Sequence, residues 1–524
     1  MTRAEFRWVL VASLLVLVFA SLPTIYAWGL ADADHVFTGF VYNAEDGNSY
    51  IAKMRMGARG EWLFHIFYTT EPHQPALAFP FHLLLGKLGA GLGLSMVLTY
   101  HLARVLLGLC LLVTVYAFVA RFTVDVGTRR LAWALVAVGS GLGWVLTLLD
   151  LTHWLGNLPL DFYVPEAYLF LVLYNLPHLA AAEALLLWAF LWVLRAFEGG
   201  GLRWCFYAAL AAFVMAWIVP FYAGVLAAAL GAYLLGLFVR RRRFPWRETS
   251  LTALAGLGAL PPVAYNAWVF ATNPAFGTWA AQNLILSPHP FHYLLGFALL
   301  LVPAIWGAIN LVRRGEERWL LPVAWVLVVP ILLYLPFNLQ RRMVAAVQVP
   351  LALLAAVGLM TWFSRKRWVL PAFVAFAGLS NLLLVIGNLG PIQQRTTPIF
   401  RPGSEIAALE WLADNSDAGE TVLASAEVGN VIPVWTDLRV FAGHGPETLH
   451  NADKLAALQE FFDPKADDAW RQSLLRDHGL DYLFYGPEEQ ALGGWDPASA
   501  AYLTPIYGSQ GYAIYRVSQV GRQP

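Results

Sequence analysis

The sequence has 524 residues, of which 59% are hydrophobic and only 13% are charged. Soluble globular proteins carry about 25% charged residues, so this composition excludes an ordinary soluble protein and indicates a polytopic membrane protein. The net charge of zero hides an asymmetry, because residues 401–524 include 18 acidic and 8 basic side chains, and the first 400 residues therefore carry the compensating positive excess. Cys110 and Cys205 both lie in apolar runs, which argues against a disulfide framework or a Cys-based metal site.

A membrane-spanning helix needs about 20 mostly apolar residues, and the sequence contains eleven runs of this kind. The fifth and sixth runs are short, and Pro220 is predicted to form the turn between them. The first run could be a signal peptide cleaved at LADADH, but its length favours an uncleaved helix. We therefore expect a polytopic α-helical membrane domain over residues 1–390, with runs at 9–30, 94–120, 131–149, 179–194, 204–219, 221–239, 251–270, 293–312, 319–336, 344–363 and 368–389.

Residues 31–93, between the first two runs, form a long polar loop. The loop contains the adjacent acids Glu45 and Asp46, followed by the stretch TTEPHQPALAFPFH with His73. Carboxylates cost little in a loop but are costly in a bilayer. Their position between two spans suggests chemistry at the membrane surface, and the alternative is a pair of solvated acids in a turn.

Two charged residues interrupt the apolar runs. Arg104 lies about three turns into the second run with His101 on the same helix face, and Glu183 lies early in the fourth run. A mid-membrane arginine costs at least about 2.5–3.5 kcal/mol, so it usually faces a cavity or a partner. Arg104 could pair with Glu183 or contact a substrate, and neither residue is expected to face lipid.

The basic loops predict the orientation of the chain. If eleven spans are correct, Arg129, Arg203, the arginines at 240–243 and the other basic clusters fall on the side of the N-terminus, which is then cytoplasmic. The first loop and the tail would both be extracytoplasmic. Arg341 and Arg342 break the rule, because they fall on the opposite side. They are either interfacial arginines that reach the headgroups or a fork that holds a phosphate group.

Residues 391–524 have the composition of a soluble domain. Helices are predicted at 404–415, with Ser404 as N-cap, at 452–462 and at 468–478, and short apolar strands lie in TVLASA, RVFAGHG, DYLFYG and YAIYRV. This alternation predicts a small C-terminal α/β domain with an accessory role, such as acceptor recognition. The tail has no phosphate-binding loop, nucleophile elbow or zinc spacing. Four residues are predicted to be ordinary turn or loop residues: Gly429, Gly443, His444 and Glu447.

The architecture resembles the GT-C superfamily of membrane glycosyltransferases, which includes the protein O-mannosyltransferases and the bacterial aminoarabinose and RgtA/B/C/D-type transferases. The resemblance rests on the N-terminal span, the long first loop with its acidic pair, the number of spans and the soluble tail. The stretches YNLPHLAAAEALLL, WAAQNLILSPHPFHYLL and LQRRMVAAVQVPLALLAAVGL are also similar to bacterial members. The resemblance implies a polyprenyl-phosphate-linked sugar as donor and a glycan, lipid or protein as acceptor, at the outer face of the cytoplasmic membrane. Nucleic acid is not expected as a partner.

The resemblance also implies that a carboxylate of the first loop is the catalytic base. We favour Asp46, because it precedes Gly47 in a turn-like EDGN where a short side chain is easily held, and Glu45 is then a supporting or metal-side partner. Two adjacent acids could bind Mg²⁺ or Mn²⁺, so metal dependence stays open. The arginines implied at the lipid phosphate are Arg341 and Arg342, and less securely Arg104.

Four further residues are candidates for contact with the sugar or the acceptor: His73, His178, Gln282 and Asn283. For the amide pair the alternative is a cap on a short interfacial helix, and for His73 it is a structural role in its loop. The expected reaction is an inverting transfer. A phosphate leaving group needs no general acid, so one carboxylate can suffice. The rival function is a transporter or lipid flippase with a charged cavity, although the sequence shows no internal repeat of the transporter kind. A third reading is a scaffold or sensor.

Overall fold

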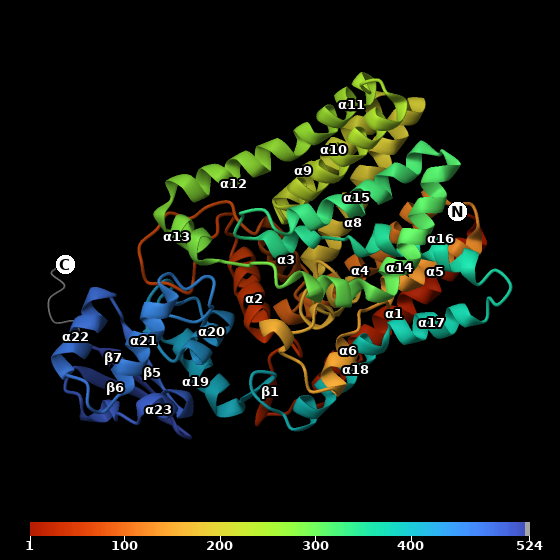
Figure 1. The fold of residues 1–524 in the computed structure, drawn as a ribbon. Coiled ribbons are helices and arrows are strands. Elements are labelled where there is room, and N and C mark those ends of the chain that lie inside the picture. Colours follow the sequence, from red (N-terminus) through yellow and green to blue (C-terminus); the bar gives the residue numbers. More distant parts are fainter. Residues whose placement is uncertain (519–524) are drawn as a thin grey trace. The chain divides into compact units, whose positions relative to one another are not determined.

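The computed structural model describes residues 1–518, which form two compact units. The first, here called the membrane unit, comprises Met1–Leu22, His101–Ala267 and Leu284–Leu389. The second, the loop–tail unit, comprises Pro23–Tyr100, Trp268–Asn283 and the chain from Gly390 onward. The tail therefore shares one compact unit with the first loop and with a short stretch from the middle of the chain. The fold is predominantly helical (Figure 1).

All eleven predicted runs hold helical residues. Among residues 1–518, seven helices are long and apolar enough to cross a membrane, or eight if the bent pair α17–α18 is one span. The smaller number arises because three runs hold short helices. The run at 131–149 is divided between α5 and α6 by a stretch with Gly139 and Gly141, since glycine disfavours a helix interior. The runs at 204–219 and 319–336 hold α9 and α15, which have 17 and 13 residues.

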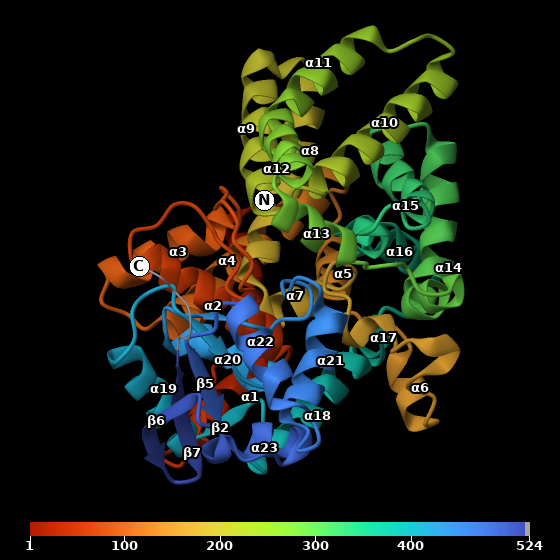
Figure 2. The ribbon, with the colours of Figure 1, turned by 90° about the vertical axis from the view of Figure 1, so that its left-hand side faces the viewer.

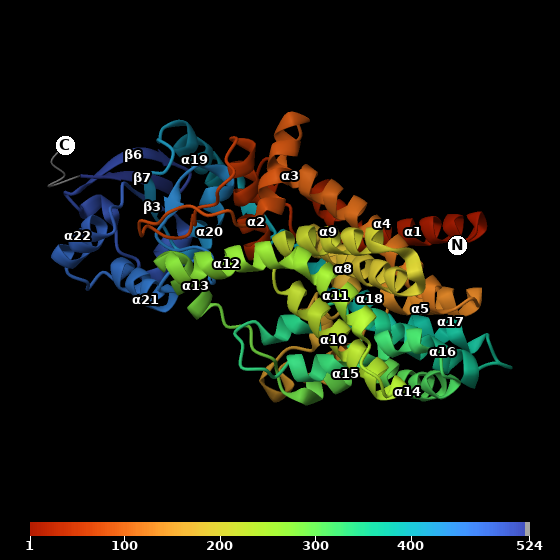
Figure 3. The same cartoon turned by 90° about the horizontal axis from the view of Figure 1, so that it is seen from above.

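The membrane unit contains these helices, some of which continue into the other unit: α1 (Arg3–Leu30), α4 (Met96–Phe122), α5 (Val126–Ala137), α6 (Gly143–Leu148), α7 (Leu169–Asn175), α8 (Pro177–Arg195), α9 (Leu202–Ile218), α10 (Tyr222–Arg241), α11 (Trp246–Gly256), α12 (Leu260–Thr272), α14 (Pro290–Arg314), α15 (Leu320–Leu332), α16 (Gln348–Trp362), α17 (Val369–Ala377) and α18 (Leu379–Gln393). Pro220 lies in the turn between α9 and α10, as predicted. Figure 3 shows α8 beside α9.

Glycines bring α14 and α16 close together. A Cβ atom on Gly307 would lie 2.1 Å from the Leu354 carbonyl oxygen, and one on Gly358 would lie 2.0 Å from that of Pro303. Small residues that allow backbones to approach are typical of helix packing in membranes, where the hydrophobic effect does not drive helices together. This packing supports the prediction of a helical membrane domain.

The loop–tail unit contains two sheets. β1 (His35–Phe37) of the first loop pairs antiparallel with β2 (Phe400–Pro402) of the tail. The larger sheet has the order β4-β3-β5-β7-β6 and consists of β3 (Thr421–Leu423), β4 (Arg439–Val440), β5 (Tyr482–Tyr485), β6 (Leu503–Ser509) and β7 (Tyr512–Val517). β3 is parallel to β4 and β5, whereas β7 is antiparallel to both of its neighbours. Figure 2 shows β5, β6 and β7 side by side.

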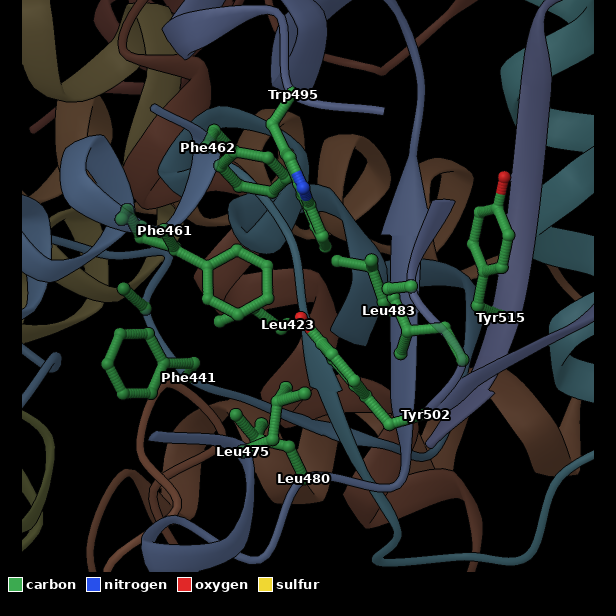
Figure 4. Packing of buried hydrophobic residues seen from close by; sticks show 14 residues of the cluster. Leu423, Phe441, Phe461, Phe462, Leu475, Leu480, Leu483, Trp495, Tyr502 and Tyr515 are labelled. Atoms are coloured by element: carbon green, nitrogen blue, oxygen red, sulfur yellow. The ribbon is translucent and has the colours of Figure 1, made fainter. Parts of the chain in front are cut away.

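In its described part, up to residue 518, this unit also holds eight α-helices: α2 (Ala44–Ala58), α3 (Pro80–Gly91), α13 (Pro274–Gln282), α19 (Gly403–Asp414), α20 (Ala426–Trp435), α21 (Asn451–Phe462), α22 (Asp468–Asp477) and α23 (Pro487–Gly493). Aromatic and leucine side chains form most of the core of the tail (Figure 4). The Phe461 ring lies edge-on to Phe462 at 5.2 Å and to Trp495 at 5.3 Å. Edge-to-face contacts of this kind stabilise a core beyond the area that they bury.

The predicted α/β tail is confirmed, with differences in detail. The predicted helices correspond to α19, α21 and α22, and the four predicted strands to β3, β4, β5 and β7. Ser404 is not the N-cap, because α19 already begins at Gly403 and Pro402 occupies the cap position. Neither Gly429 nor Gly443 is a turn glycine with positive φ. They allow a close approach instead, since a Cβ on Gly429 would lie 2.0 Å from the Ala442 carbonyl oxygen.

Candidate active site

The acidic pair lies in the first turn of α2. The predicted turn at EDGN is therefore wrong. Acids at the start of a helix interact favourably with its dipole, as Arg55 does in the last turn, and this favours the helix over a turn. Gly47 is needed for packing, because a Cβ there would lie 2.4 Å from the Phe40 ring.

The Asp46 carboxylate is held by two donors and stays partly exposed. His444 Nε2 donates to Asp46 Oδ1 at 2.9 Å, and Asn43 Nδ2 donates to Oδ2 at 2.5 Å. The Asp46 side chain is 37% exposed, whereas that of His444 is only 6% exposed. Glu45 accepts a hydrogen bond of 2.8 Å from the backbone N–H of Gly445. Both acids of the pair therefore contact one segment of the tail.

Behind Asp46 lies a buried ionic cluster. Lys53 Nζ lies 2.6 Å from Glu447 Oε1, and both side chains are almost fully buried. Ser49 donates to the same carboxylate oxygen at 2.9 Å and also contacts Lys53. Glu447 Oε1 lies 3.8 Å from His444 Nδ1. The two ring nitrogens of His444 thus face two different carboxylates, Asp46 and Glu447.

The electrostatics of this cluster favour charged side chains. Burial by itself lowers the pKa of His444, but the hydrogen bond to Asp46 and the charge of Glu447 outweigh it, so the pKa lies above the usual 6.5. Burial by itself raises the pKa of Glu447, but Lys53 and His444 outweigh it, so the pKa lies below the usual 4.5. Both shifts favour the ionised forms of His444 and Glu447.

Gln282 forms hydrogen bonds with the backbone of the same tail segment. It is the last residue of α13, and its Nε2 donates to the carbonyl oxygens of Pro446 and Thr448, at 3.1 and 2.6 Å. Its Oε1 accepts from the backbone N–H of His450 at 3.2 Å. Asn283 is the C-cap residue of α13. We call residues 443–450 the tail loop.

The two histidines predicted to contact the sugar or the acceptor belong to different units. His73 Nε2 accepts from the backbone N–H of Ile66 and its Nδ1 donates to the Glu71 carbonyl, both at 2.9 Å. These bonds are those of a structural loop histidine, the alternative stated above. Burial lowers the pKa of His73. His178 lies in the first turn of α8, in the membrane unit.

Arg104 and Glu183 do not pair with each other. The buried Arg104 guanidinium donates to His101 Nδ1, to the Leu173 carbonyl and to the Ser21 hydroxyl, at 3.2, 2.8 and 2.9 Å. The contact with His101 follows the predicted spacing. Glu183 accepts from the Tyr222 hydroxyl at 3.4 Å. Of the two alternatives for Arg104, the ion pair with Glu183 is therefore wrong.

Arg341 and Arg342 lie in the short helical turn Gln340–Val344 of the membrane unit. Arg341 stacks over the Tyr163 ring at 4.9 Å, and its Nε is buried without a hydrogen-bond partner among residues 1–518. Arg342 Nε lies 3.6 Å from the Glu166 carboxylate. Arg341 therefore has donor capacity that the described residues do not use.

A metal site is not apparent in the part of the chain that the structure describes. Within residues 1–518, no group of three or more His, Cys, Asp or Glu side chains is arranged to hold an ion. Glu45 and Asp46 direct their carboxylates to Gly445 and to His444.

Neither family models nor curated protein sequences match this sequence. Solved structures match it over almost its whole length. ArnT from Cupriavidus metallidurans matches with a TM-score of 0.56 and 15% identity, over 98% of this chain and 100% of that one. The archaeal oligosaccharyltransferase AglB from Archaeoglobus fulgidus matches with a TM-score of 0.53 and 13% identity. The match covers 99% of this chain and 75% of AglB. The arabinofuranosyltransferase AftD from Mycobacteria matches with a TM-score of 0.54 and 18% identity. The match covers 100% of this chain but only 42% of AftD.

All three neighbours are GT-C glycosyltransferases. This chain has the GT-C fold. The resemblance inferred from the sequence is confirmed at the level of the fold, and so is the combination of a multi-pass helical part with a C-terminal sheet-containing domain.

The sequence analysis missed the residues that contact the acidic pair from the tail. His444 and Glu447 were predicted to be ordinary loop residues, yet both are buried against α2. A histidine between two glycines and a glutamate after a proline, in GHGPE, resemble residues of any exposed loop. The signal that could have been used is Lys53, a lysine among apolar residues in YIAKMRM, because a buried lysine requires an acidic partner.

Proposed function

We propose that this protein is a glycosyltransferase that moves a sugar from a polyprenyl-phosphate donor to an acceptor hydroxyl, with inversion at the anomeric carbon. The observation that carries the proposal is the fold match with ArnT over both whole chains. ArnT has also been solved bound to undecaprenyl phosphate, and that structure matches this chain with a TM-score of 0.53. AglB was solved with a dolichol-phosphate. A polyprenyl phosphate is accordingly the proposed carrier here.

Asp46 is the proposed base. Its carboxylate combines partial exposure with two donors that fix its orientation. It takes the proton of the acceptor hydroxyl while the hydroxyl oxygen bonds to the anomeric carbon. The bond between that carbon and the phosphate oxygen breaks on the opposite face, and its electron pair stays on the phosphate. General base catalysis of this kind contributes roughly 10²–10⁴ in rate.

Arg341 and Arg342 are the proposed contacts of the lipid phosphate, with the buried Arg104 as a further candidate. The support is that the Nε atoms of Arg341 and Arg342 are both buried without a hydrogen-bond partner within residues 1–518. A planar guanidinium binds phosphate oxygens through paired hydrogen bonds, and its charge stabilises the phosphate as it leaves. The adjacent Arg342 keeps a carboxylate close by, so Arg341 is the stronger candidate.

The remaining assignments follow from the contacts above. Glu45 supports the site by fixing Gly445 of the tail loop. Contacts of His178 and Asn283 with the sugar or acceptor stay proposals, as does a contact with His73, whose ring nitrogens serve its own loop. We place the reaction on the extracytoplasmic side of the cytoplasmic membrane, on the distribution of basic residues along the sequence.

The experiment separates an enzyme from a flippase. The purified protein is reconstituted in vesicles with a panel of undecaprenyl-phosphate hexoses and pentoses, and lipids are analysed by mass spectrometry. An enzyme releases free undecaprenyl phosphate from at least one donor, through transfer to an added acceptor or slowly to water. A flippase moves the donor between leaflets with its mass unchanged, and that result would contradict the proposal.

A further inference from the structure

Four separate connections anchor the tail loop, and two of them reach the first turn of α2. His444 bonds Asp46, Gly445 bonds Glu45, and Glu447 forms the buried pair with Lys53. Gln282 holds the loop from the other side through two carbonyl oxygens and one N–H group. A loop anchored at so many points presents His444 to the carboxylate in one defined position.

We infer that His444 is a positioning residue for the transfer reaction and that it acts by holding the Asp46 carboxylate in the orientation that accepts the acceptor's proton. The inference rests on the proposed function. His444 itself is buried and lies behind the partly exposed Asp46, so Asp46 is the group that meets the substrate. The tail then contributes to catalysis and is more than an accessory domain.

The geometry explains how the imidazole does this. Its Nε2–H and the Asn43 amide each hold one oxygen of Asp46, which fixes the plane of the carboxylate. Each carboxylate oxygen accepts more than one hydrogen bond, so the acceptor hydroxyl can bind as well. In the transfer step the hydroxyl proton passes to Asp46, and His444 keeps its own proton. The negative charge of Glu447 beside Nδ1 favours the protonated form of His444.

Glutamine and asparagine at position 444 test the inference. The glutamine amide reaches far enough to donate to Asp46 Oδ1, whereas the asparagine amide is one methylene shorter. We expect His444→Asn to lower kcat at least tenfold with the KM for the undecaprenyl-phosphate donor within twofold of wild type. His444→Gln should restore most of kcat. His450→Asn is the matched control in the same loop, since His450 is exposed and asparagine tolerates its positive φ.

The outcomes are distinct. If wild type turns over the donor and Asp46→Asn does not, while both His444 variants keep wild-type kcat, the inference is wrong and the proposed function stands. The inference is also wrong if His444→Gln and His444→Asn reduce kcat equally at unchanged melting temperature. A purely structural role of His444 predicts that the longer glutamine side chain does not restore kcat. If wild type releases no lipid phosphate from any donor, the proposed function itself fails.

Discussion

At the residue scale, the buried pair of Lys53 and Glu447 contributes to the stability of the folded protein. Removing one partner of a buried ion pair leaves an uncompensated charge and costs about 3–5 kcal/mol. We expect Lys53→Met to lower the melting temperature of the purified protein markedly, as followed by tryptophan fluorescence. Lys465→Met is the control, because Lys465 is exposed. Equal melting temperatures for the two variants would show that the pair is not buried as described.

Arg341 carries a prediction about binding. Hydrogen bonds to charged groups contribute about 1.5–3 kcal/mol each, which corresponds to roughly ten- to a hundredfold in affinity. Arg341→Ala should therefore weaken binding of undecaprenyl phosphate by that factor, measured by thermophoresis in detergent. Arg313→Ala, at the exposed end of α14, should leave the affinity unchanged. Unaltered binding in Arg341→Ala would remove this residue from the phosphate site.

At the element scale, α13 and the tail loop are linked by one side chain. Gln282→Ala removes three hydrogen bonds to the loop backbone, so amide hydrogens of residues 443–450 should exchange faster, as measured by mass spectrometry. Asn283→Ala changes the neighbouring amide, which caps α13, and should leave exchange in the loop as in wild type. Equal exchange in both variants would mean that Gln282 does not hold the loop.

The packing of α2 against α3 depends on glycine. A Cβ on Gly86 would lie 1.8 Å from the Met54 carbonyl oxygen, whereas one on Gly91 in the same helix meets nothing within 4 Å. Overpacking typically costs about 1–3 kcal/mol. We expect Gly86→Ala to lower the melting temperature and Gly91→Ala to leave it unchanged or raise it slightly, since alanine favours helix. A tolerated Gly86→Ala would contradict the close approach of the two helices.

Most elements of the tail could be predicted because their signals are local. Helix α21, expected at 452–462, occupies Asn451–Phe462, and the strand DYLFYG became β5. Strand β6 escaped prediction, since Pro505 and a register shift beside it break the alternation that marks a strand. The EDGN turn failed for another reason: Asp and Gly favour turns locally, but acids also suit the first turn of a helix.

At the scale of the whole molecule, the fold could be predicted from the sequence, and so could the acidic pair as a candidate site. The tail residues that contact the pair could not. Hydrophobic runs and a change in composition are enough to indicate a multi-pass helical part with an α/β tail. His444 lies 398 positions from Asp46 along the chain, and no pattern in one sequence pairs two residues so distant. The acidic pair was visible as an anomaly near apolar runs, whereas the residues that hold it were indistinguishable from an ordinary loop.

The central claim is that Asp46 is the base of a transfer from a polyprenyl-phosphate sugar, and turnover by two matched variants tests it most directly. Asp46→Asn keeps the shape of the side chain but removes the base, whereas Asp34→Asn makes the same change at an exposed position of the same loop. We predict that Asp46→Asn loses at least a hundredfold of the rate of undecaprenyl phosphate release, consistent with roughly 10²–10⁴ for a general base. Asp34→Asn should match wild type. Full activity of Asp46→Asn, with wild type active, would contradict the account.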